Sequence, residues 1–335
     1  MSKNKVLILK NDRTGDLFVS LRAINKILSK HSNEDINIFL SNINHKFSFL
    51  FPQLKKKKIS MKLSILEKLN IFFYLLFNNV KTVYILTPKN FYYYLPFFFR
   101  NIKFYAITIK SLNNRPPSFL LKYLFKYKVL DRTSIKKRKS SYLIQENLIE
   151  QTSNKNNLHK TIITSHNFKY PKKFTFFHYK KKFFDELLNW DLDTVSKFLF
   201  FLNEKYENIC FSSELNDEKI NEFFLNKFNH YDFNKDIKKI INNKNIFFLK
   251  NIDGNNLFDA VNKSTEVVSP EGIITHMGYF LQKPILALMH FKLKDKRDFI
   301  NQIISCKEWF PPNNYNYTVL KKDFNHSIKK LTKRI

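Results

Sequence analysis

Glycine is almost missing from this chain, which has 4 glycines among its 335 residues. Where glycine is used so rarely, we expect each one to stand where the backbone needs its conformational freedom. Cysteine is scarcer still, because Cys210 and Cys306 are the only two. Two cysteines cannot form a disulfide framework or a zinc cage of cysteines. The composition therefore excludes a disulfide-rich secreted protein and fits a reducing cytosol.

Long apolar runs are missing as well. No uninterrupted apolar stretch reaches the roughly 18–20 residues that a membrane span needs. The nearest candidates, Ile71–Phe77 and Phe91–Phe99, are too short. Residues Met1–Lys5 lead straight into an apolar strand and lack the long apolar core of a signal peptide. We therefore expect a cytoplasmic protein, or one that resides at a membrane surface.

Acidic residues are outnumbered by basic ones, 28 Asp and Glu against 58 Lys and Arg, which gives a formal net charge of +30. So large a charge favours an anionic partner, either a nucleic acid or an anionic membrane surface. Composition offers a second explanation, because many Lys, Asn, Ile and Phe with few Gly and Ala are what an AT-rich genome imposes on any protein. The hydrophobic content of 44% is that of a globular protein and excludes a disordered chain.

Short apolar strands alternate with helical patterns along the chain, which predicts an α/β protein with parallel sheets. The length suits two cores, and we expect Rossmann-like domains at 1–155 and 170–320, a polar linker at 151–173 and a basic, helical tail at 321–335. Open α/β sheets bind ligands beyond the carboxyl ends of their strands, so a cleft between two such halves is expected. The expected strands are Val6–Leu9, Ile36–Leu40, Thr82–Leu86, Lys103–Ile107, Phe174–Phe177, Asn208–Phe211, Asn245–Leu249, Glu266–Val268 and, as the last one, Pro284–Leu288.

The first candidate site is the polar turn Lys10–Asp16, which directly follows the first predicted strand. Gly15 would allow a positive φ or the close approach of a ligand to the backbone. Asp16 stands at the start of the next helix, where it is either an N-terminal cap or a general base for an acceptor hydroxyl. Position alone favours the cap. Asp12 has the same two possibilities, and Arg13 is either a solvated turn residue or a phosphate clamp.

The second candidate site is Ser269–His276, which follows another predicted strand and opens a helix. The exposed N–H groups of a helix N-terminus form a ready site for a phosphate or pyrophosphate. Gly272 falls in this strand-to-helix turn as Gly15 does in the first half. Glu271 could accept hydrogen bonds from a ribose or sugar hydroxyl. His276 lies inside the helix, where a lone histidine more often packs than catalyses.

Two further segments follow predicted strands in the second half. Lys180 and Lys181 belong to a basic cluster that would bind a diphosphate, although a solvated lysine run is the simpler interpretation in so basic a chain. Ser212, Ser213 and Glu214 follow the strand that ends at Phe211, and alone they are ordinary turn residues.

Together these segments resemble the lipopolysaccharide heptosyltransferases, glycosyltransferase family nine. The opening Val6–Leu17, a strand followed by a polar turn ending in Gly-Asp and then by a helix, looks like the start of that family. The segment Phe258–Leu288 is similar to its second signature, with an acidic residue, small residues, a histidine five positions on and a Lys-Pro pair before a strand. Asn189-Trp190 is similar to its middle segment. The resemblance covers most of the chain, with the signatures in the right order.

This resemblance implies a GT-B fold of two Rossmann-like domains that face a central cleft. It also implies metal-independent transfer of a sugar, typically heptose from ADP-heptose, to a lipid-anchored acceptor of lipopolysaccharide biosynthesis. The reaction would take place at the cytoplasmic face of the inner membrane, with the protein bound peripherally. No metal and no separate cofactor are implied, because basic side chains and helix dipoles can stabilise the leaving diphosphate.

The same resemblance assigns roles to residues. Asp16 becomes the catalytic base, which reverses the preference that position alone gave. The turn Asp12, Arg13, Thr14 and Gly15 would contact the acceptor or a phosphate. The donor would be bound by Lys180, Lys181, Glu214, Glu271, Gly272, Ile274, Thr275 and His276.

Three departures from the family pattern concern the donor. Glu271 replaces the usual Asp, Gly272-Ile273 replaces a Ser/Thr-Gly pair, and a glycine expected near Ser212 is missing. A different nucleotide sugar or an inactive relative therefore stays open. A second alternative is a non-catalytic basic protein that binds a membrane or a nucleic acid, the latter without any recognised nucleic-acid motif. The aromatic run Phe91–Arg100 would either enter a membrane interface or form a buried face between the domains.

Overall fold

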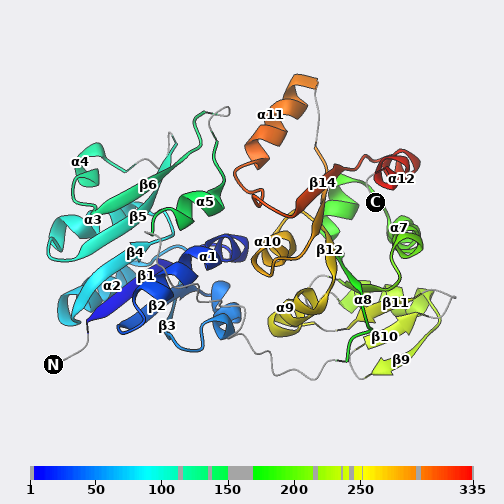
Figure 1. Ribbon diagram of the computed structural model, residues 1–335, viewed down its shortest axis with the longest axis horizontal. Coiled ribbons are helices and arrows are strands. Elements are labelled where there is room, and N and C mark those ends of the chain that lie inside the picture. Colours follow the sequence, from blue (N-terminus) through cyan, green and yellow to red (C-terminus); the bar gives the residue numbers. More distant parts are fainter. Residues whose placement is uncertain are drawn as a thin grey trace. The chain divides into compact units, whose positions relative to one another are not determined.

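The computed structural model describes residues 4–111, 116–134, 138–149, 169–213, 218–234, 237–240, 245–250, 252–291 and 296–333 (Figure 1). The chain divides into two compact units. Unit 1 comprises Met1–Ile162 and Ile300–Pro312, and unit 2 comprises Ile163–Phe299 and Asn313–Ile335. The predicted linker falls largely on 150–168, outside the described residues. Within the described ranges, no helix has both the length and the apolar character needed to cross a membrane.

Unit 1 is built on a six-stranded parallel sheet with the strand order β3-β2-β1-β4-β5-β6. Its central strand β1 is buried along almost its whole length, as expected for a strand covered on both faces. The strands are β1 (Lys5–Lys10), β2 (Asp35–Ser41), β3 (Lys55–Ile59), β4 (Val80–Ile85), β5 (Lys103–Lys110) and β6 (Lys126–Asp131).

Helices cover both faces of this sheet. The chain moves from β1 to β2 in one direction and from β3 through β4 and β5 to β6 in the other, so right-handed crossovers place the connecting helices on opposite faces. α1 packs with α5 on one face, while α2, α3 and α4 share a core with the other. The helices are α1 (Thr14–Lys30), the 3₁₀ segment η1 (Asn44–Leu50), α2 (Ile65–Phe77), α3 (Asn90–Phe98), α4 (Ser118–Leu121) and α5 (Ser141–Glu146), and α11 (Lys296–Cys306) ends within this unit.

Unit 2 is built on an eight-stranded sheet with the order β14-β13-β12-β7-β8-β11-β10-β9. All neighbours are parallel except at one end, where β9, β10 and β11 are antiparallel. The strands are β7 (Thr175–His178), β8 (Ile209–Ser212), β9 (His230–Asn234), β10 (Ile237–Ile240), β11 (Ile246–Leu249), β12 (Glu266–Pro270), β13 (Ile285–Met289) and β14 (Tyr315–Val319). The helices are the π-helical segment η3 (Lys182–Leu187), α7 (Leu192–Lys205), α8 (Glu218–Lys227), α9 (Gly254–Lys263), α10 (Ile273–Phe280) and α12 (Phe324–Thr332).

Every predicted strand is present, but the sequence analysis missed five. The prediction that Pro284–Leu288 is the last strand was wrong, because β14 follows it and pairs with β13. The antiparallel β9–β10 pair also corrects the expectation of wholly parallel sheets. The missed strands lack the apolar runs on which the prediction rested. β3, for example, is four lysines and one isoleucine, with the lysines exposed on the edge of the sheet, where charge prevents pairing with another chain.

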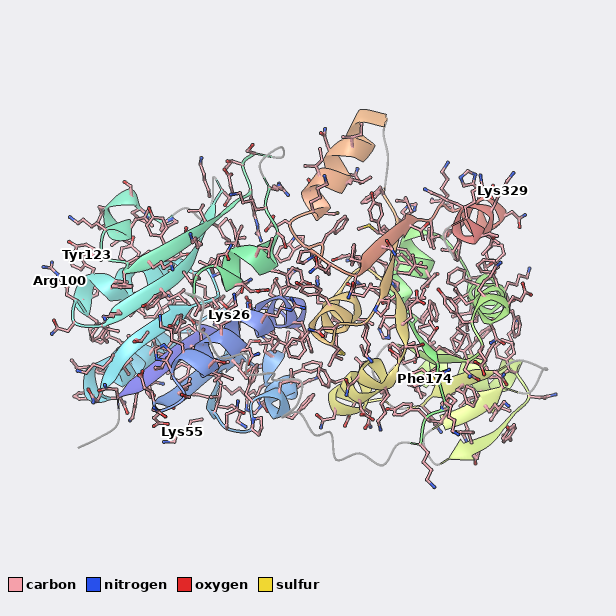
Figure 2. All side chains as sticks on the ribbon, viewed as in Figure 1. Lys26, Lys55, Arg100, Tyr123, Phe174 and Lys329 are labelled. Atoms are coloured by element: carbon pink, nitrogen blue, oxygen red, sulfur yellow. The ribbon has the colours of Figure 1, made fainter. Side chains whose placement is uncertain are left out.

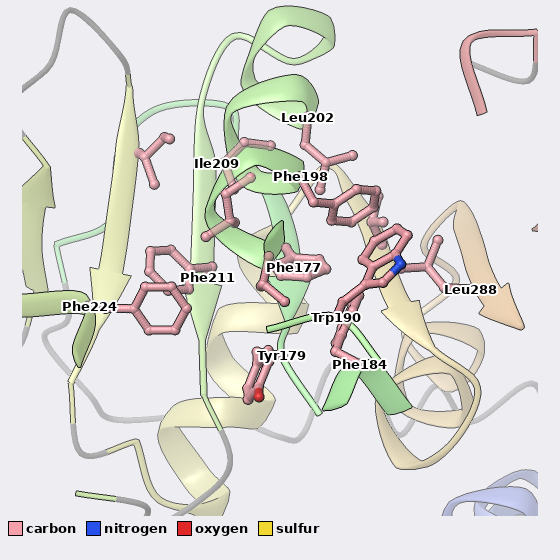
Figure 3. Close-up of a cluster of buried hydrophobic side chains, with 14 of the residues drawn as sticks. Phe177, Tyr179, Phe184, Trp190, Phe198, Leu202, Ile209, Phe211, Phe224 and Leu288 are labelled. Carbon is pink, nitrogen blue, oxygen red and sulfur yellow. The ribbon is translucent and has the colours of Figure 1, made fainter. Parts of the chain in front are cut away.

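An aromatic core holds the loop after β7 in place (Figure 3). The rings of Tyr179 and Phe184 are stacked with their centroids 5.5 Å apart, and Phe184 contacts Trp190 and Phe198 at 6.0 Å. The Trp190 indole N–H donates a hydrogen bond of 2.8 Å to the carbonyl of Lys322, which anchors the core to the segment before α12. Because Tyr179 directly precedes Lys180, this packing fixes the position of a candidate site residue.

Candidate functional site

The turn between β1 and α1 shows how Asp16 is placed. α1 begins at Thr14, its N-cap is Arg13, and no side chain caps the helix. Asp16 lies in the first turn of the helix, so the interpretation of Asp16 as the cap is wrong. Gly15 lies in the same turn and does not have a positive φ, because Gly272 is the glycine that does. Gly15 therefore does not provide a positive φ, and close approach of a ligand to it stays a prediction.

Asp12 is held by its neighbours. Its carboxylate oxygen Oδ2 lies 2.7 Å from Nζ of Lys10, a residue only 1% exposed. The amide of Asn44 donates to Oδ1 of Asp12 at 3.4 Å, and the hydroxyl of Ser41 donates to the Asp12 carbonyl at 2.7 Å. A buried ammonium needs a counter-charge, so Asp12 completes the fold of the turn.

Asp16 has a different environment. Burial raises the pKa of its carboxyl above the ordinary value, and the nearby Asp12 carboxylate raises it further. Lys10, Arg132 and Arg13 act in the opposite direction and lower the pKa of Asp16. A half-buried carboxylate whose pKa is raised by burial, at the carboxyl edge of a parallel sheet, has the properties of a general base.

Two basic residues that the sequence analysis missed belong to this edge. Lys89 follows β4, its ammonium group donates to the carbonyl of Met61, and burial lowers its pKa while the charge of Asp12 opposes that change. Arg132 directly follows β6 and interacts electrostatically with Asp16. The signal was available, since a basic residue follows the carboxyl end of a strand in both cases, but β6 itself had not been predicted.

Arg132 is positioned by the segment that returns to unit 1 from unit 2. Its Nε donates a hydrogen bond of 2.9 Å to Oε1 of Glu308, and its guanidinium lies 5.4 Å from the centre of the Trp309 ring. Arg138 approaches Oε2 of the same glutamate at 3.8 Å and donates to the Arg132 carbonyl at 3.1 Å. Glu308 is buried, so one carboxylate orients both arginines.

Unit 2 forms a separate constellation at the start of α10. Gly272 is the N-cap of this helix with a φ of 153°, a conformation that other residues rarely adopt. The Thr275 hydroxyl accepts from the Gly272 N–H at 3.2 Å and donates to the Gly272 carbonyl at 2.7 Å. The following N–H groups of the first turn, at Ile273 and Ile274, have no acceptor within the helix. The expectation that a glycine stands where the backbone needs its conformational freedom is therefore confirmed at Gly272.

Lys180 lies at this helix start. Its ammonium donates to the carbonyl of Glu271 at 3.3 Å, and a Cβ placed on Gly272 would lie 3.3 Å from the same nitrogen. β7 and β12 are parallel neighbours, which brings the loops after their carboxyl ends together. A cation beside a helix N-terminus forms an anion site with two sources of positive potential.

Burial and Lys180 shift the pKa values of the two titratable groups beside this site, Glu271 and His276. Burial raises the pKa of the Glu271 carboxyl, and Lys180 opposes that rise. Burial and the charge of Lys180 together lower the pKa of His276 to about 4, which makes its imidazole neutral at neutral pH. Nε2 of His276 lies 3.8 Å from Oε1 of Glu271. The ring of His276 is almost completely buried.

The other residues predicted to bind the donor have environments of their own. Lys181 is exposed and pairs with Asp185 one helical turn on. The Ile274 side chain is buried in the core, so only its backbone could contact a ligand. Glu214 lies outside the described residues. Ser212 bonds to the buried His178 at 2.9 Å, and Ser213 donates to Asn221. In the described parts of the chain, no group of three or more His, Cys, Asp or Glu could hold a metal ion.

Solved structures with a similar fold span almost all of the chain. A glycosyl transferase of family 9 from Veillonella parvula matches over 100% of this chain and 90% of its own, with a TM-score of 0.61 and 12% identity. The E. coli heptosyltransferase WaaC, solved with ADP, matches over 99% and 96%, with a TM-score of 0.59 and 11% identity. A UDP-GlcNAc 2-epimerase from Methanocaldococcus jannaschii matches over 98% and 92%, with a TM-score of 0.54 and 14% identity. No family model and no curated protein sequence matches the chain.

These likenesses concern the fold, since the identities are low. Together with the two α/β units of the chain, they confirm the prediction of a GT-B fold. The resemblance to family nine is likewise confirmed at the level of the fold. The chain thus has the GT-B fold of two Rossmann-like units that the family 9 glycosyl transferase and the heptosyltransferases share with UDP-GlcNAc 2-epimerases.

Proposed function

We propose that the protein is a metal-independent glycosyltransferase that moves a sugar, heptose first among the candidates, from a nucleotide-diphosphate donor to an anionic glycolipid of the lipopolysaccharide-core type. The reaction would take place at the cytoplasmic face of the inner membrane. The observation that carries the proposal is Asp16, a half-buried carboxylate with a raised pKa in the turn after β1. The UDP and ADP enzymes of this fold make nucleotide sugars the first substrates to test.

Asp16 acts as the general base in this proposal. Its carboxylate takes the proton of an acceptor hydroxyl while the hydroxyl oxygen forms a bond to the anomeric carbon of the donor sugar. The bond between that carbon and the diphosphate oxygen breaks, and the nucleoside diphosphate leaves with the electron pair. A pKa raised by burial makes the carboxylate a stronger base than an exposed aspartate.

The start of α10 stabilises the leaving group. Negative charge develops on the diphosphate as its bond to the sugar breaks, and the ammonium of Lys180 with the first-turn N–H groups of α10 supplies fixed positive potential for it. Gly272 leaves the backbone open to a phosphate. Glu271 accepts hydrogen bonds from a hydroxyl of the ribose or the sugar.

The charge of the chain supports an anionic acceptor. A net charge of +30 attracts phosphorylated glycolipids and the anionic lipids around them. A nucleic acid is also anionic, but the sequence contains no recognised nucleic-acid motif. A glycolipid acceptor would account both for the two sites at the sheet edges and for the net positive charge.

A ligand screen followed by a turnover assay tests the proposal. The melting temperature is measured with ADP-, UDP- and GDP-sugars, because a ligand that binds only the folded state raises it. Turnover is then followed as release of nucleoside diphosphate, with and without a lipopolysaccharide-core acceptor. Acceptor-dependent release supports transfer. Conversion of a UDP-sugar without an acceptor would point to an epimerase, and tight, salt-sensitive nucleic-acid binding without nucleotide-sugar binding would contradict the proposal.

A further inference from the structure

Helix α2 is apolar on two sides. Ile71 and Leu75 are buried in the core beneath it. Its outer side carries six large apolar residues around the exposed Asn70, and Phe77 is 76% exposed. Large apolar residues on a helix are normally buried against a partner. The exposed residues are Ile65, Leu66, Leu69, Phe73, Leu76 and Phe77.

Neighbouring helices extend this surface. Phe98 at the end of α3 is 61% exposed, and Phe97 is 40% exposed. The ring of Phe98 lies 5.8 Å from that of Phe72 in α2 and 5.3 Å from that of Phe97, which in turn lies 5.4 Å from the Tyr123 ring after α4. The outer sides of α2 and α3 with Tyr123 therefore form one continuous surface, which we call the aromatic face.

The aromatic run Phe91–Arg100 is divided between the core of unit 1 and the surface. Tyr92, Tyr93 and Leu95 point inward and are buried in the core of unit 1. Phe97 and Phe98 belong to the exposed aromatic face. The run is thus core on one side and open on the other, and a contiguous apolar surface of this kind marks an interaction site.

The aromatic face carries basic residues and almost no acidic ones. Between Ile36 and Leu130 the sequence has one acidic residue, Glu67, which is bound in the capping box at the start of α2. The guanidinium of Arg100 lies 5.8 Å from the Phe97 ring centre and 5.3 Å from that of Tyr123. Figure 2 shows Arg100 beside Tyr123. The face therefore suits an apolar partner with a negatively charged surface.

A pocket of about 480 Å³ opens where α2 and α3 end. Phe77 and Phe98 are among its lining residues, Lys81 and Arg100 supply cations, and no acidic residue lines it. Two cations in a largely polar pocket, beside exposed aromatic rings, match the phosphate of an anionic lipid whose acyl chains lie against those rings.

We propose that the aromatic face docks the protein on a bilayer of anionic phospholipid, with Phe77 and Phe98 entering the interface and Lys81 and Arg100 contacting lipid phosphates. A second copy of the chain is a poor occupant, because the two faces would oppose cation to cation. The inference names a membrane as the partner of the proposed transferase. The purpose of docking rests on the proposed function, whereas docking itself does not.

The position of α2 links docking to the proposed base. The loop before α2 contacts the turn between β1 and α1, since the side-chain amide of Asn11 donates a hydrogen bond of 2.8 Å to the carbonyl of Ser60. The exposed Ile65 and Leu66 follow this loop. A bilayer that contacts the whole length of α2 therefore reaches the edge of the sheet where Asp16 would receive a lipid-anchored acceptor.

Vesicle binding tests the inference without any sugar donor, so its failure is distinct from a failure of glycosyl transfer. The full-length protein is mixed with vesicles of phosphatidylglycerol and phosphatidylethanolamine, or of phosphatidylcholine alone, and bound protein is measured by flotation. We expect binding to the anionic vesicles, weakened by 0.5 M NaCl. The double variant Phe77→Ser/Phe98→Ser should lose roughly tenfold or more in partition, because two exposed rings no longer enter the interface.

Two further variants make the test specific. Lys81→Gln/Arg100→Gln should lower binding to anionic vesicles roughly tenfold while it leaves the aromatic rings in place. Leu143→Ser/Tyr231→Ser removes two apolar residues that are also exposed, 44% and 46%, but lie on α5 and β9, and should bind as the wild type does. Equal binding by all variants, or equal binding to neutral vesicles, would overturn the inference. So would a wild-type dimer that ignores vesicles and becomes monomeric in the Phe77/Phe98 variant.

Discussion

The ammonium group of Lys10 lies 2.7 Å from Oδ2 of Asp12, in a pair whose lysine is almost completely buried. This pair separates the tasks of the two carboxylates in the turn after β1. Asp12 neutralises a buried charge, whereas burial raises the pKa of Asp16, the proposed general base. The five-residue span Asp12–Asp16 thus holds one structural and one proposed catalytic aspartate.

Asp16→Asn should abolish most turnover and leave the fold intact. Loss of a general base lowers kcat roughly 100-fold to 10,000-fold. Because the folded state raises the pKa of Asp16, the ionised carboxylate destabilises the folded protein at neutral pH, so the amide should keep or raise the melting temperature. Turnover and thermal unfolding at pH 7.5 measure both effects. Undiminished turnover would remove Asp16 from the mechanism.

Asp12→Asn should show the opposite pattern, a loss of stability with the proposed base Asp16 left in place. It leaves the ammonium of Lys10 buried without its counter-charge, which costs about 3 kcal/mol of unfolding free energy. Urea unfolding of the variant beside Asp16→Asn gives the comparison. If both variants lose equal stability, the division of tasks between the two carboxylates is mistaken.

Arg132→Gln should move the acidic limb of the pH–rate profile to higher pH. The guanidinium lowers the pKa of Asp16, so its removal lets burial and Asp12 raise that pKa further. The dependence of kcat/KM on pH between 5 and 9 measures the shift, and Arg132→Lys, which keeps the charge, should restore the limb. A fall in rate that is equal at every pH would mean that Arg132 acts only through its bond to Glu308.

Lys180→Met should weaken donor binding roughly tenfold or more, because it removes the proposed charged partner of the diphosphate at the start of α10. Lys181→Met is the matched control. Lys181 is the next residue, equally basic, but it pairs with Asp185 on the surface and should change the dissociation constant less than twofold. Calorimetric titration with the nucleotide sugar measures both constants. Equal losses would contradict a specific role for Lys180.

Acidification should destabilise unit 2 through His178 and His276. Burial, with the charge of Lys180, lowers the pKa of each to about 4. The unfolded chain therefore takes up protons that the folded chain does not as pH falls below the unfolded value of 6.5. The cost approaches roughly 3 kcal/mol per histidine towards pH 4.

Urea unfolding at pH 7.5, 6.0 and 5.0 tests this dependence, with His276→Gln compared at each pH. The raised pKa values of Asp16 and Glu271 act in the opposite sense and are common to both proteins. The variant should lose less stability than the wild type between pH 6.0 and 5.0. Parallel curves would show that His276 is not held neutral by burial.

Local patterns were enough to predict the alternation of strands and helices, whereas the GT-B fold was implied by the resemblance to family nine. Val6–Leu9 is a continuous apolar run, and such a run before a helical period specifies a buried strand and its crossover. The strands β3 and β9 could not be predicted this way, because strands exposed at a sheet edge have little apolar sequence, and the inner strand β10 was missed because its four residues include two lysines.

The sequence by itself determined which residue types follow the strands: the Gly15-Asp16 pair, Lys180 and Gly272 are readable because covalent order places them at strand ends. Only the tertiary structure decided their tasks. It places Asp12 against the buried Lys10 and pairs Lys181 with Asp185. It also places Arg132, which follows β6, where its charge lowers the pKa of Asp16. The reason is that ion pairing and burial depend on neighbours distant in the chain, which a local pattern does not contain.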